Sequence, residues 1–217
     1  MLATFPEVFD LASVPTGDMP GDSVQVTIDD GLEDCEYDIK VVFDDDTPDL
    51  IVMGVAGAGK TTVATILAER LGWPVAEADE FHPPVNIAKM SSGTPLTDED
   101  RWPWLDAMRD WLTAHTLEGR STVVTCSALK VSYRDILRSA QGRVRFVHLD
   151  GTVELIGERL ANRNGHFMPP SLLPSQFETL EQLGPDEDGI VVPVSSSANT
   201  VADQALVRLG LLQRATD

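Results

Sequence analysis

The chain has 217 residues, of which 42% are hydrophobic, and this suits one α/β domain with a packed core and an additional segment. Its formal net charge of −19 argues against non-specific nucleic-acid binding, because that binding relies on lysines and arginines that neutralise phosphates. No apolar stretch approaches the ~20 residues that span a bilayer, and no basic segment precedes an apolar run, so we expect neither a membrane partner nor a secretory signal.

The first 49 residues differ in composition from the rest, because they hold 14 of the 35 acidic residues and only one basic residue, Lys40. Residues 23–28 and 35–43 alternate apolar with polar side chains, and an Asp-Asp-Gly turn signal lies between them. One interpretation is a β-hairpin; the other is a disordered acidic tail, since high charge opposes folding. We therefore predict an acidic N-terminal extension, residues 1–49, and a second domain, residues 50–217.

From Leu50 onward the chain alternates short apolar runs with segments of helical period. Five short strands with intervening helices favour a mainly parallel sheet covered on both faces, with ligands outside the carboxyl ends of the strands. The expected strands are 50–55, 75–78, 122–126, 145–149 and 190–194, and the expected helices are 60–71, 85–90, 100–115, 132–139, 153–162, 172–180 and 200–209.

A glycine loop, GVAGAGKT at residues 54–61, follows the first of these strands and opens the first helix. Strand, glycine loop with Lys-Thr, and helix form the context of a phosphate-binding loop. The glycines let backbone N–H groups turn toward phosphate oxygens, and the helix start adds its positive dipole end. Lys60 is expected to reach the β- and γ-phosphates, and Thr61 to ligate Mg²⁺. The predicted nucleotide-binding residues are Gly54, Val55, Ala56, Gly57, Ala58, Gly59, Lys60 and Thr61.

The second predicted strand runs into a segment rich in polar residues, 77–83. Alternation along a strand places Glu77 and Asp79 on the same side, at the mouth next to the glycine loop. A carboxylate there can accept a proton from an attacking hydroxyl or hold a water on Mg²⁺. The competing interpretation is that both acids are solvated loop residues, and His82 taken alone fits an ordinary polar loop residue.

The helix predicted at 100–115 begins with an unusual combination of residues. Thr97 or Asp98 can cap it. Arg101 lies at the positive end of the helix dipole, an unfavourable place for a cation, and this favours a role such as holding an anionic carboxylate. Trp102 and Trp104 are more typical of core anchors than of ligand platforms.

The third strand leads into a polar loop, residues 126–130. Cys126 is expected to be buried and inert, and with only one other cysteine the chain lacks a disulfide framework, which favours a reduced, cytoplasmic setting. Ser127 lies at the carboxyl end of the strand, where its hydroxyl can bind a substrate hydroxyl. Arg134, in the next helix, has either Asp135 or the helix surface as its expected partner.

Arg159 and Arg163 are four residues apart and therefore share one face of a helix. That helix runs into Gly-His-Phe-Met-Pro-Pro, residues 165–170, which is typical of a mobile lid. Cations in a lid can close over transferring phosphates and stabilise charge in the transition state. The alternative is a solvated basic helix end that complements the helix dipole.

Taken together, these blocks resemble the thermoresistant-type gluconokinases, small P-loop kinases related in fold to adenylate and shikimate kinases. The resemblance covers about three quarters of the chain, residues 50–209, and its blocks occur in the order and spacing of that family. It implies a three-layer α/β/α P-loop kinase fold with a five-stranded parallel sheet and a mobile lid. The blocks are the glycine loop, 78–83, 86–90, 93–101, 126–130 with 133–135, and 165–168 with 172–181.

The resemblance implies phosphorylation of D-gluconate by ATP, with Mg²⁺, to 6-phospho-D-gluconate for the pentose phosphate route. The family tends toward dimers, so a homodimer is expected. By the resemblance Asp79 lies near the 6-hydroxyl of the substrate. The implied catalytic residues are Lys60, Asp79 and Arg163; the implied substrate-binding residues are Asp79, His82, Lys89, Arg101, Ser127 and His166. Arg159 joins the ATP-binding set, and Thr61 holds Mg²⁺ with Glu77 or Asp79 through a water.

Two positions depart from the family pattern. Ala56 stands where the family commonly has Ser, and Glu77 begins a motif that often begins with Asp, which leaves the role of the first acid open. The acidic extension has no counterpart in the family. Two other interpretations remain: a related kinase for another sugar acid or shikimate, and a nucleotide-dependent interaction protein that uses residues 1–49.

Overall fold

The computed structural model describes residues 24–27, 36–39, 48–161 and 173–211. The chain divides into two units, Met1–Phe43 and Asp44–Asp217. In the first unit β1 (Val24–Thr27) and β2 (Glu36–Ile39) pair in antiparallel fashion, with Val24 opposite Ile39. Both strands fall within the two alternating runs of the extension, whereas the turn signal between them lies outside the described residues. The domain boundary at residue 49 stays a prediction.

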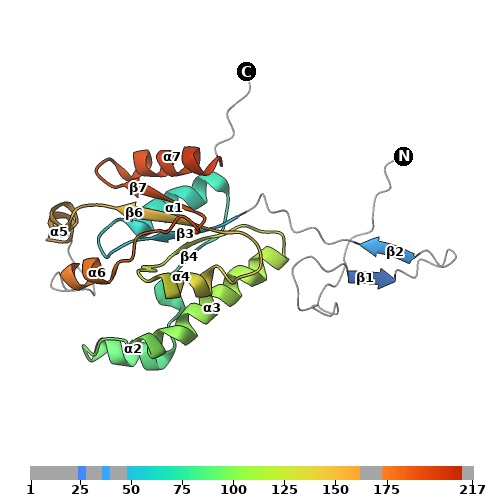
Figure 1. The fold of residues 1–217 in the computed structure, drawn as a ribbon, viewed down its shortest axis with the longest axis horizontal. Helices are drawn as coiled ribbons and strands as arrows, with labels where there is room; N and C mark the ends of the chain where they lie inside the picture. Colours follow the sequence, from blue (N-terminus) through green and yellow to red (C-terminus); the bar gives the residue numbers. More distant parts are fainter. Residues whose placement is uncertain (1–23, 28–35, 40–47, 162–172, 212–217) are drawn as a thin grey trace, which may run out of the picture. The chain divides into compact units, whose positions relative to one another are not determined.

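The second unit is built on a five-stranded parallel sheet, as the sequence predicted (Figure 1). Its strands lie in the order β4-β5-β3-β6-β7, so the first strand of the unit is central and its neighbours come from later in the chain. In such sheets the crevice for ligands opens at the carboxyl ends of the central strands. The strands are β3 (Asp49–Met53), β4 (Val75–Glu77), β5 (Val123–Thr125), β6 (Val144–Asp150) and β7 (Gly189–Pro193).

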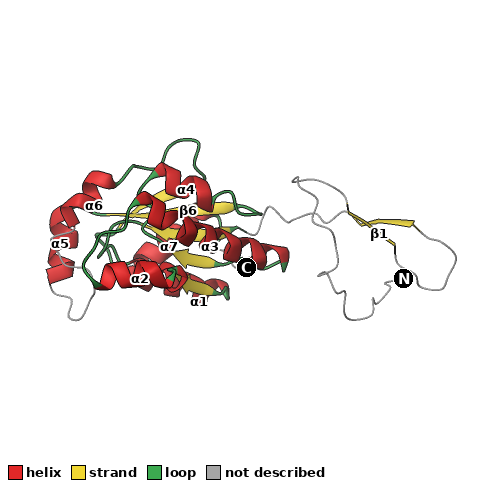
Figure 2. Cartoon of the chain, turned by 90° about the horizontal axis from the view of Figure 1, so that it is seen from below, coloured by secondary structure: helices red, strands yellow, loops and turns green. Residues whose placement is uncertain are grey.

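Helices cover both faces of this sheet and complete the three-layer arrangement that was expected (Figure 1). On one face lie α1 (Lys60–Leu71) and α7 (Ala198–Leu209), and on the other α3 (Asp98–Leu117) and α4 (Val131–Leu137). Figures 1 and 2 place two further helices side by side at one end. No helix in the described ranges has the length and apolar character to cross a membrane. The remaining elements are η2 (Ala78–Phe81), α2 (Pro84–Ser91), α5 (Val153–Ala161) and α6 (Leu173–Thr179), the last two being the pair at one end.

The sheet divides the core into two apolar clusters, and β3 contributes side chains to both. Leu50 and Val52 pack with α1 and α7, whereas Ile51 and Met53 pack with α3 and α4. All four side chains are fully buried. The strand therefore reads as an uninterrupted apolar run because both of its faces are covered by helices.

β3 begins at Asp49, one residue before the predicted strand, and this acid belongs to the fold. Its Oδ1 accepts hydrogen bonds from the Thr122 N–H at 2.8 Å and the Thr122 hydroxyl at 2.6 Å, and Oδ2 accepts from Thr116 at 3.0 Å. Burial raises the pKa of the Asp49 carboxyl, although these hydrogen bonds oppose the shift. One of the 14 acids counted with the extension is thus satisfied inside the domain.

The start of α3 resolves the choice between two capping residues. Thr97 is the N-cap: its hydroxyl accepts from the Asp100 N–H at 3.3 Å, and the Asp100 carboxylate accepts from the Thr97 N–H at 3.0 Å. This capping box starts the helix at Asp98, two residues earlier than predicted. Trp104 is buried, and its indole N–H donates to the Ala78 carbonyl at 2.6 Å, which confirms its role as a core anchor.

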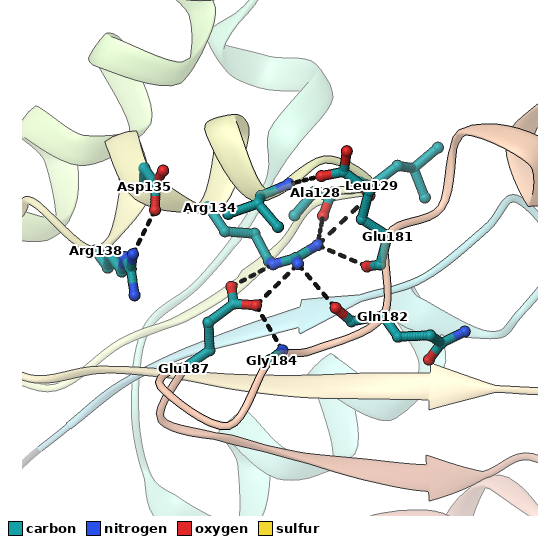
Figure 3. A network of polar contacts seen from close by, with 10 residues as sticks. Ala128, Leu129, Arg134, Asp135, Arg138, Glu181, Gln182, Gly184 and Glu187 are labelled. Carbon is teal, nitrogen blue, oxygen red and sulfur yellow. Dashed lines mark hydrogen bonds and ion pairs between the residues drawn. The ribbon is translucent and has the colours of Figure 1, made fainter.

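Arg134 on α4 is fully buried, and the expectation that it pairs with Asp135 or lies on the helix surface was wrong. Its guanidinium donates to both carboxylate oxygens of Glu187, at 2.5 Å and 2.9 Å, while Asp135 pairs with Arg138 (Figure 3). Arg134 thereby joins the loop after β5 to the segment after α6. Its other hydrogen bonds go to the carbonyls of Ala128, Leu129, Glu181 and Gln182.

Candidate active site

The glycine loop leaves β3 at Gly54 and makes two very close approaches to neighbouring elements. At Gly54, where φ is +137°, a Cβ atom would lie 2.8 Å from the carbonyl oxygen of Leu149 on β6. At Gly57, where φ is +83°, a Cβ would lie 2.7 Å from Cγ of Leu160 on α5. Both the left-handed backbone and the lack of space require glycine at these positions. The loop is therefore held between β6 and α5.

The start of α1 concentrates positive charge at the end of this loop. Gly59 is the N-cap, no side chain caps the helix, and its first turn carries no acidic residue. The ammonium group of Lys60 donates to the carbonyls of Gly54 and Val55 at 3.0 Å and 3.1 Å. A helix N-terminus and an ammonium group at one point form an arrangement that suits a phosphate.

A pocket of about 380 Å³ lies beside the glycine loop, a volume in the range of small-molecule sites. Arg159 on α5 borders it, and the Arg159 guanidinium donates to the Val194 carbonyl. The family resemblance implied that Arg159 binds ATP, and the pocket is lined by Arg159 together with residues of the loop. The other lining residues include Gly57, Gly59 and Thr62 of the loop and α1, and Ser196, Ser197 and Val201 at the start of α7.

Glu77 and Asp79 do not lie on one side of a strand, so that argument from alternation was wrong. The strand ends at Glu77, and the chain turns into η2, which carries Asp79. Glu77 accepts a hydrogen bond from the hydroxyl of Thr125, its register partner on β5. Glu77 is therefore engaged between two strands, whereas Asp79 lies beyond the end of the sheet.

His82 is the C-terminal cap of η2, three residues after Asp79, and presents a buried nitrogen. Its ring stacks on Trp104, with centroids 4.5 Å apart and planes 12° apart, and its Nδ1 has no hydrogen-bond partner in the described part of the chain. Burial lowers the pKa of the imidazole; the charge of Asp79 opposes this shift, and that of Arg101 adds to it. A neutral imidazole with an unsatisfied buried nitrogen is suited to hydrogen-bond a ligand.

Cys126 marks the point where the two halves of the site meet. Burial raises the pKa of its thiol to about 12, so the thiol is protonated and inert, as predicted. The charges that act on this thiol include those of Lys60, Arg101 and Asp79. All three charged groups therefore lie within electrostatic range of the carboxyl end of β5, where Cys126 follows the strand.

The other two cations predicted for the substrate side are held by local contacts. The ammonium group of Lys89 pairs with Asp100 at 2.5 Å. The Arg101 guanidinium donates to the Leu96 carbonyl at 3.4 Å, and its central carbon lies 5.8 Å from the centre of the Tyr133 ring. Lys89 on α2 is thus tied to the start of α3, where Arg101 lies.

Three predicted site residues remain, and the structure describes one of them, Ser127. Ser127 follows β5, and its carbonyl accepts a hydrogen bond from the Gly54 N–H at 3.3 Å, which ties the loop after β5 to the glycine loop. Arg163 and His166, with the predicted lid, lie outside the described residues. Their roles stay predictions.

Gln176 on α6 belongs to the site, and sequence reasoning did not single it out. Its side-chain oxygen accepts a hydrogen bond of 2.7 Å from the backbone N–H of Ala56, in the glycine loop. The available signal was its place in the 172–181 block, a polar residue directly after the predicted lid. Ala56 is also the position where the serine typical of the family is absent.

We predict that Gln176→Met raises the KM for ATP about fivefold, because the glycine loop loses a partly buried hydrogen bond worth about 1 kcal/mol. Methionine keeps the length of the side chain but provides no strong acceptor. The KM for the second substrate is expected to stay within twofold. Steady-state kinetics measures both, with Gln182→Met as the control because that side chain is exposed. A lower KM for ATP would show that Gln176 competes with the nucleotide instead of positioning the loop.

Comparisons with known proteins agree with this arrangement. Residues 50–181 match the AAA domain family. A gluconokinase of Gluconobacter oxydans is 52% identical over 157 residues, covering 72% of this chain and 88% of that protein. The thermosensitive gluconokinase of Escherichia coli is 43% identical over 155 residues, covering 71% and 83%.

Solved structures are similar over the same region of the chain. A gluconokinase from Sinorhizobium meliloti has a TM-score of 0.68 at 46% identity and covers 76% of this chain and 92% of its own. An unliganded sugar kinase from Janibacter has a TM-score of 0.71 at 51% identity, covering 76% and 95%. Sequence and structure therefore place the similarity in the second unit.

Proposed function

The chain belongs to the gluconokinase family, and from that premise we propose that it transfers the γ-phosphoryl group of ATP to the 6-hydroxyl of D-gluconate, giving 6-phospho-D-gluconate. The observation that carries the proposal is that a phosphate-binding loop with Lys60 at the start of α1 and the segments that carry Asp79 and Arg101 all lie within electrostatic range of Cys126, just after β5. A phosphate-binding group, an acceptor for a proton and a cation for a sugar acid are thereby available near the same end of the sheet.

The residues on the nucleotide side fit ATP. The pocket of about 380 Å³ beside the loop has room for the nucleoside, and the phosphates would meet the N-terminus of α1. Lys60 would exchange its two carbonyl contacts for phosphate oxygens. The exposed hydroxyl of Thr61 is a hard oxygen ligand of the kind that Mg²⁺ prefers, and when bound this ion neutralises charge on the phosphates.

On the acceptor side, Asp79 is positioned to act as the base. Its carboxylate takes the proton of the 6-hydroxyl as the new bond between that oxygen and the γ-phosphorus forms. The bond from the γ-phosphorus to the bridging oxygen breaks, and its electron pair stays on ADP. His82, as a neutral imidazole, holds a sugar hydroxyl through its unsatisfied nitrogen. Lys89 and Ser127 complete the proposed acceptor side, with Arg163 and His166 from the lid.

A coupled ADP-release assay on the full chain tests this function. The panel contains D-gluconate, other sugar acids, shikimate and nucleoside monophosphates. We expect turnover with D-gluconate and ATP that depends on Mg²⁺ and exceeds turnover with every other acceptor. Absence of gluconate-dependent turnover would overturn the proposal, and turnover with shikimate alone would favour the related-kinase alternative. The family also leads us to propose a cytoplasmic homodimer, and light scattering of the full chain measures the oligomeric state.

A further inference from the structure

A group of charged residues lies where α3 and α4 begin, and of its members only Arg101 has a role in the function proposed above. The ammonium group of Lys130 donates to both oxygens of Asp98, at 2.9 Å and 2.6 Å, and the Tyr133 hydroxyl donates to Asp98 at 2.5 Å. Lys130 lies 5.4 Å and Arg101 5.8 Å from the centre of the Tyr133 ring. We call Asp98, Arg101, Lys130 and Tyr133 the carboxylate cluster, because a carboxylate already occupies its centre.

The carboxylate cluster keeps a net positive charge. It has two cations, Arg101 and Lys130, and one carboxylate, that of Asp98. The Arg101 guanidinium donates to the Leu96 carbonyl at 3.4 Å, and this acceptor is neutral. In a protein whose net charge is −19, a local excess of positive charge is an arrangement that favours an anionic ligand.

The carboxylate cluster adjoins the acceptor side of the active site. The charge of Arg101 acts on His82, on Asp98 and on the thiol of Cys126. Lys130 stands three residues after Ser127, in the loop that follows β5. Through Arg101 the cluster therefore lies within electrostatic range of the residues proposed to hold the sugar.

The chemistry of gluconate requires an anion site away from the reacting hydroxyl. Its carboxyl group and its 6-hydroxyl are at opposite ends of a six-carbon chain. If the 6-hydroxyl meets Asp79, the carboxylate must be received by a different part of the site. Asp79 itself cannot do this, because two carboxylates in contact repel each other.

We propose that Arg101 and Lys130 bind the carboxylate of the sugar acid, and that Asp98 holds this place in the ligand-free protein. The proposal rests on the function proposed above and adds Lys130 and Tyr133 as residues that determine specificity. Asp98 keeps the Lys130 ammonium and the Tyr133 hydroxyl in position, and the substrate carboxylate takes over their hydrogen bonds. After this exchange Asp98 remains in the first turn of α3, where the helix dipole stabilises its charge.

The test measures whether Lys130 recognises charge on the substrate. Lys130→Met and the wild type are compared with D-gluconate and with its neutral amide, D-gluconamide, as a substrate or as a competitive inhibitor. We expect the variant to raise the KM for gluconate roughly tenfold to a hundredfold, as for a lost charge-assisted hydrogen bond. The KM for ATP and the affinity for the amide are expected to stay within about twofold, so that the preference for acid over amide shrinks.

Arg138→Met is the matched control, because Arg138 is an exposed cation that caps the other end of α4 and also pairs with an aspartate. We expect this control to keep the preference of the wild type for gluconate over gluconamide. If Lys130→Met weakens the binding of gluconate and of gluconamide equally, Lys130 does not recognise the carboxylate. That result would overturn the role of Lys130 and leave the proposed gluconate kinase function unaffected. A wild type that does not phosphorylate gluconate would instead overturn the proposed function.

Asp98→Asn tests the exchange. Asparagine keeps the size of the side chain and removes the competing negative charge, so we expect the KM for gluconate to fall several-fold. Thermal unfolding of the variant, compared with the wild type, verifies that the start of α3 is intact. An increase in the KM for gluconate with unchanged unfolding would contradict the exchange, since Asp98 would then serve the bound state.

Discussion

Replacement of Lys60 by methionine is expected to lower kcat by about three orders of magnitude, with gluconate and ATP both saturating. Phosphoryl transfer is catalysed mainly by stabilising charge that spreads over the transferring group, and Lys60 supplies a positive charge at the N-terminus of α1. Methionine keeps most of the bulk of the lysine stem and removes only the ammonium group. The coupled ADP-release assay measures the change.

Two further measurements separate a loss of chemistry from a loss of structure in Lys60→Met. The ammonium group also holds the carbonyls of Gly54 and Val55, so thermal unfolding should be recorded without and with ATP. Arg70→Met is the control, because Arg70 lies on the same helix and pairs with Asp203 on α7. We expect the control to keep kcat within twofold. Near-normal turnover of Lys60→Met would contradict the assignment of the site.

Replacement of Arg134 by methionine is expected to lower the free energy of unfolding by about 3–5 kcal/mol. The change leaves the Glu187 carboxylate, whose side chain is 4% exposed, without its counter-charge. It also leaves carbonyls of the loop after β5 and of the segment after α6 without their donor (Figure 3). Urea unfolding, analysed as a two-state transition, measures the difference.

The partner residue gives a second test of the same ion pair. The double variant Arg134→Met, Glu187→Met should lose less free energy of unfolding than the sum of the two single variants. The reason is that the double variant leaves no unpaired charge in the interior, whereas each single variant does. Arg138→Met, which breaks the exposed pair with Asp135, should cost no more than about 1 kcal/mol. Additive losses in the double variant would show that Arg134 and Glu187 act independently.

The same pair predicts how stability depends on pH. Burial by itself raises the pKa of the Glu187 carboxyl, but the hydrogen bonds from Arg134 and the Gly184 N–H, with the Arg134 charge, outweigh it and lower the pKa below 4.5. The contribution of Glu187 is therefore fully present above pH 4.5 and is lost as the pH falls through the lowered pKa. The difference in stability between the wild type and Glu187→Gln should narrow in that acid range.

Much of the nucleotide side was predictable because its signals are local. The apolar run of β3, the left-handed glycines and the start of α1 are adjacent in the chain, so short-range backbone preferences and burial determine them together. The same is true of the capping box at Thr97. Family resemblance, which rests on blocks of sequence, added the substrate and the expected place of Asp79 near its 6-hydroxyl.

Other parts of the site depended on how distant segments meet. Asp79 left the strand because the chain turns into η2 after Glu77, which alternation cannot reveal. Gln176 reaches Ala56 across 120 positions, and Arg134 reaches Glu187 across 53. For Gln176 and for Arg134, the hydrogen-bond partner comes from a segment that is distant in the chain and that the fold brings beside it.

The amino-acid sequence by itself determined the phosphate-binding loop, the order of strands and helices, and the kind of reaction. Only the tertiary structure decided which charges are paired: Arg134 with Glu187 in the interior, and Lys130 with Asp98 beside Arg101. The physical reason is that helix and strand formation is governed by neighbours in the chain, whereas burial of a charge demands a partner wherever the fold supplies one.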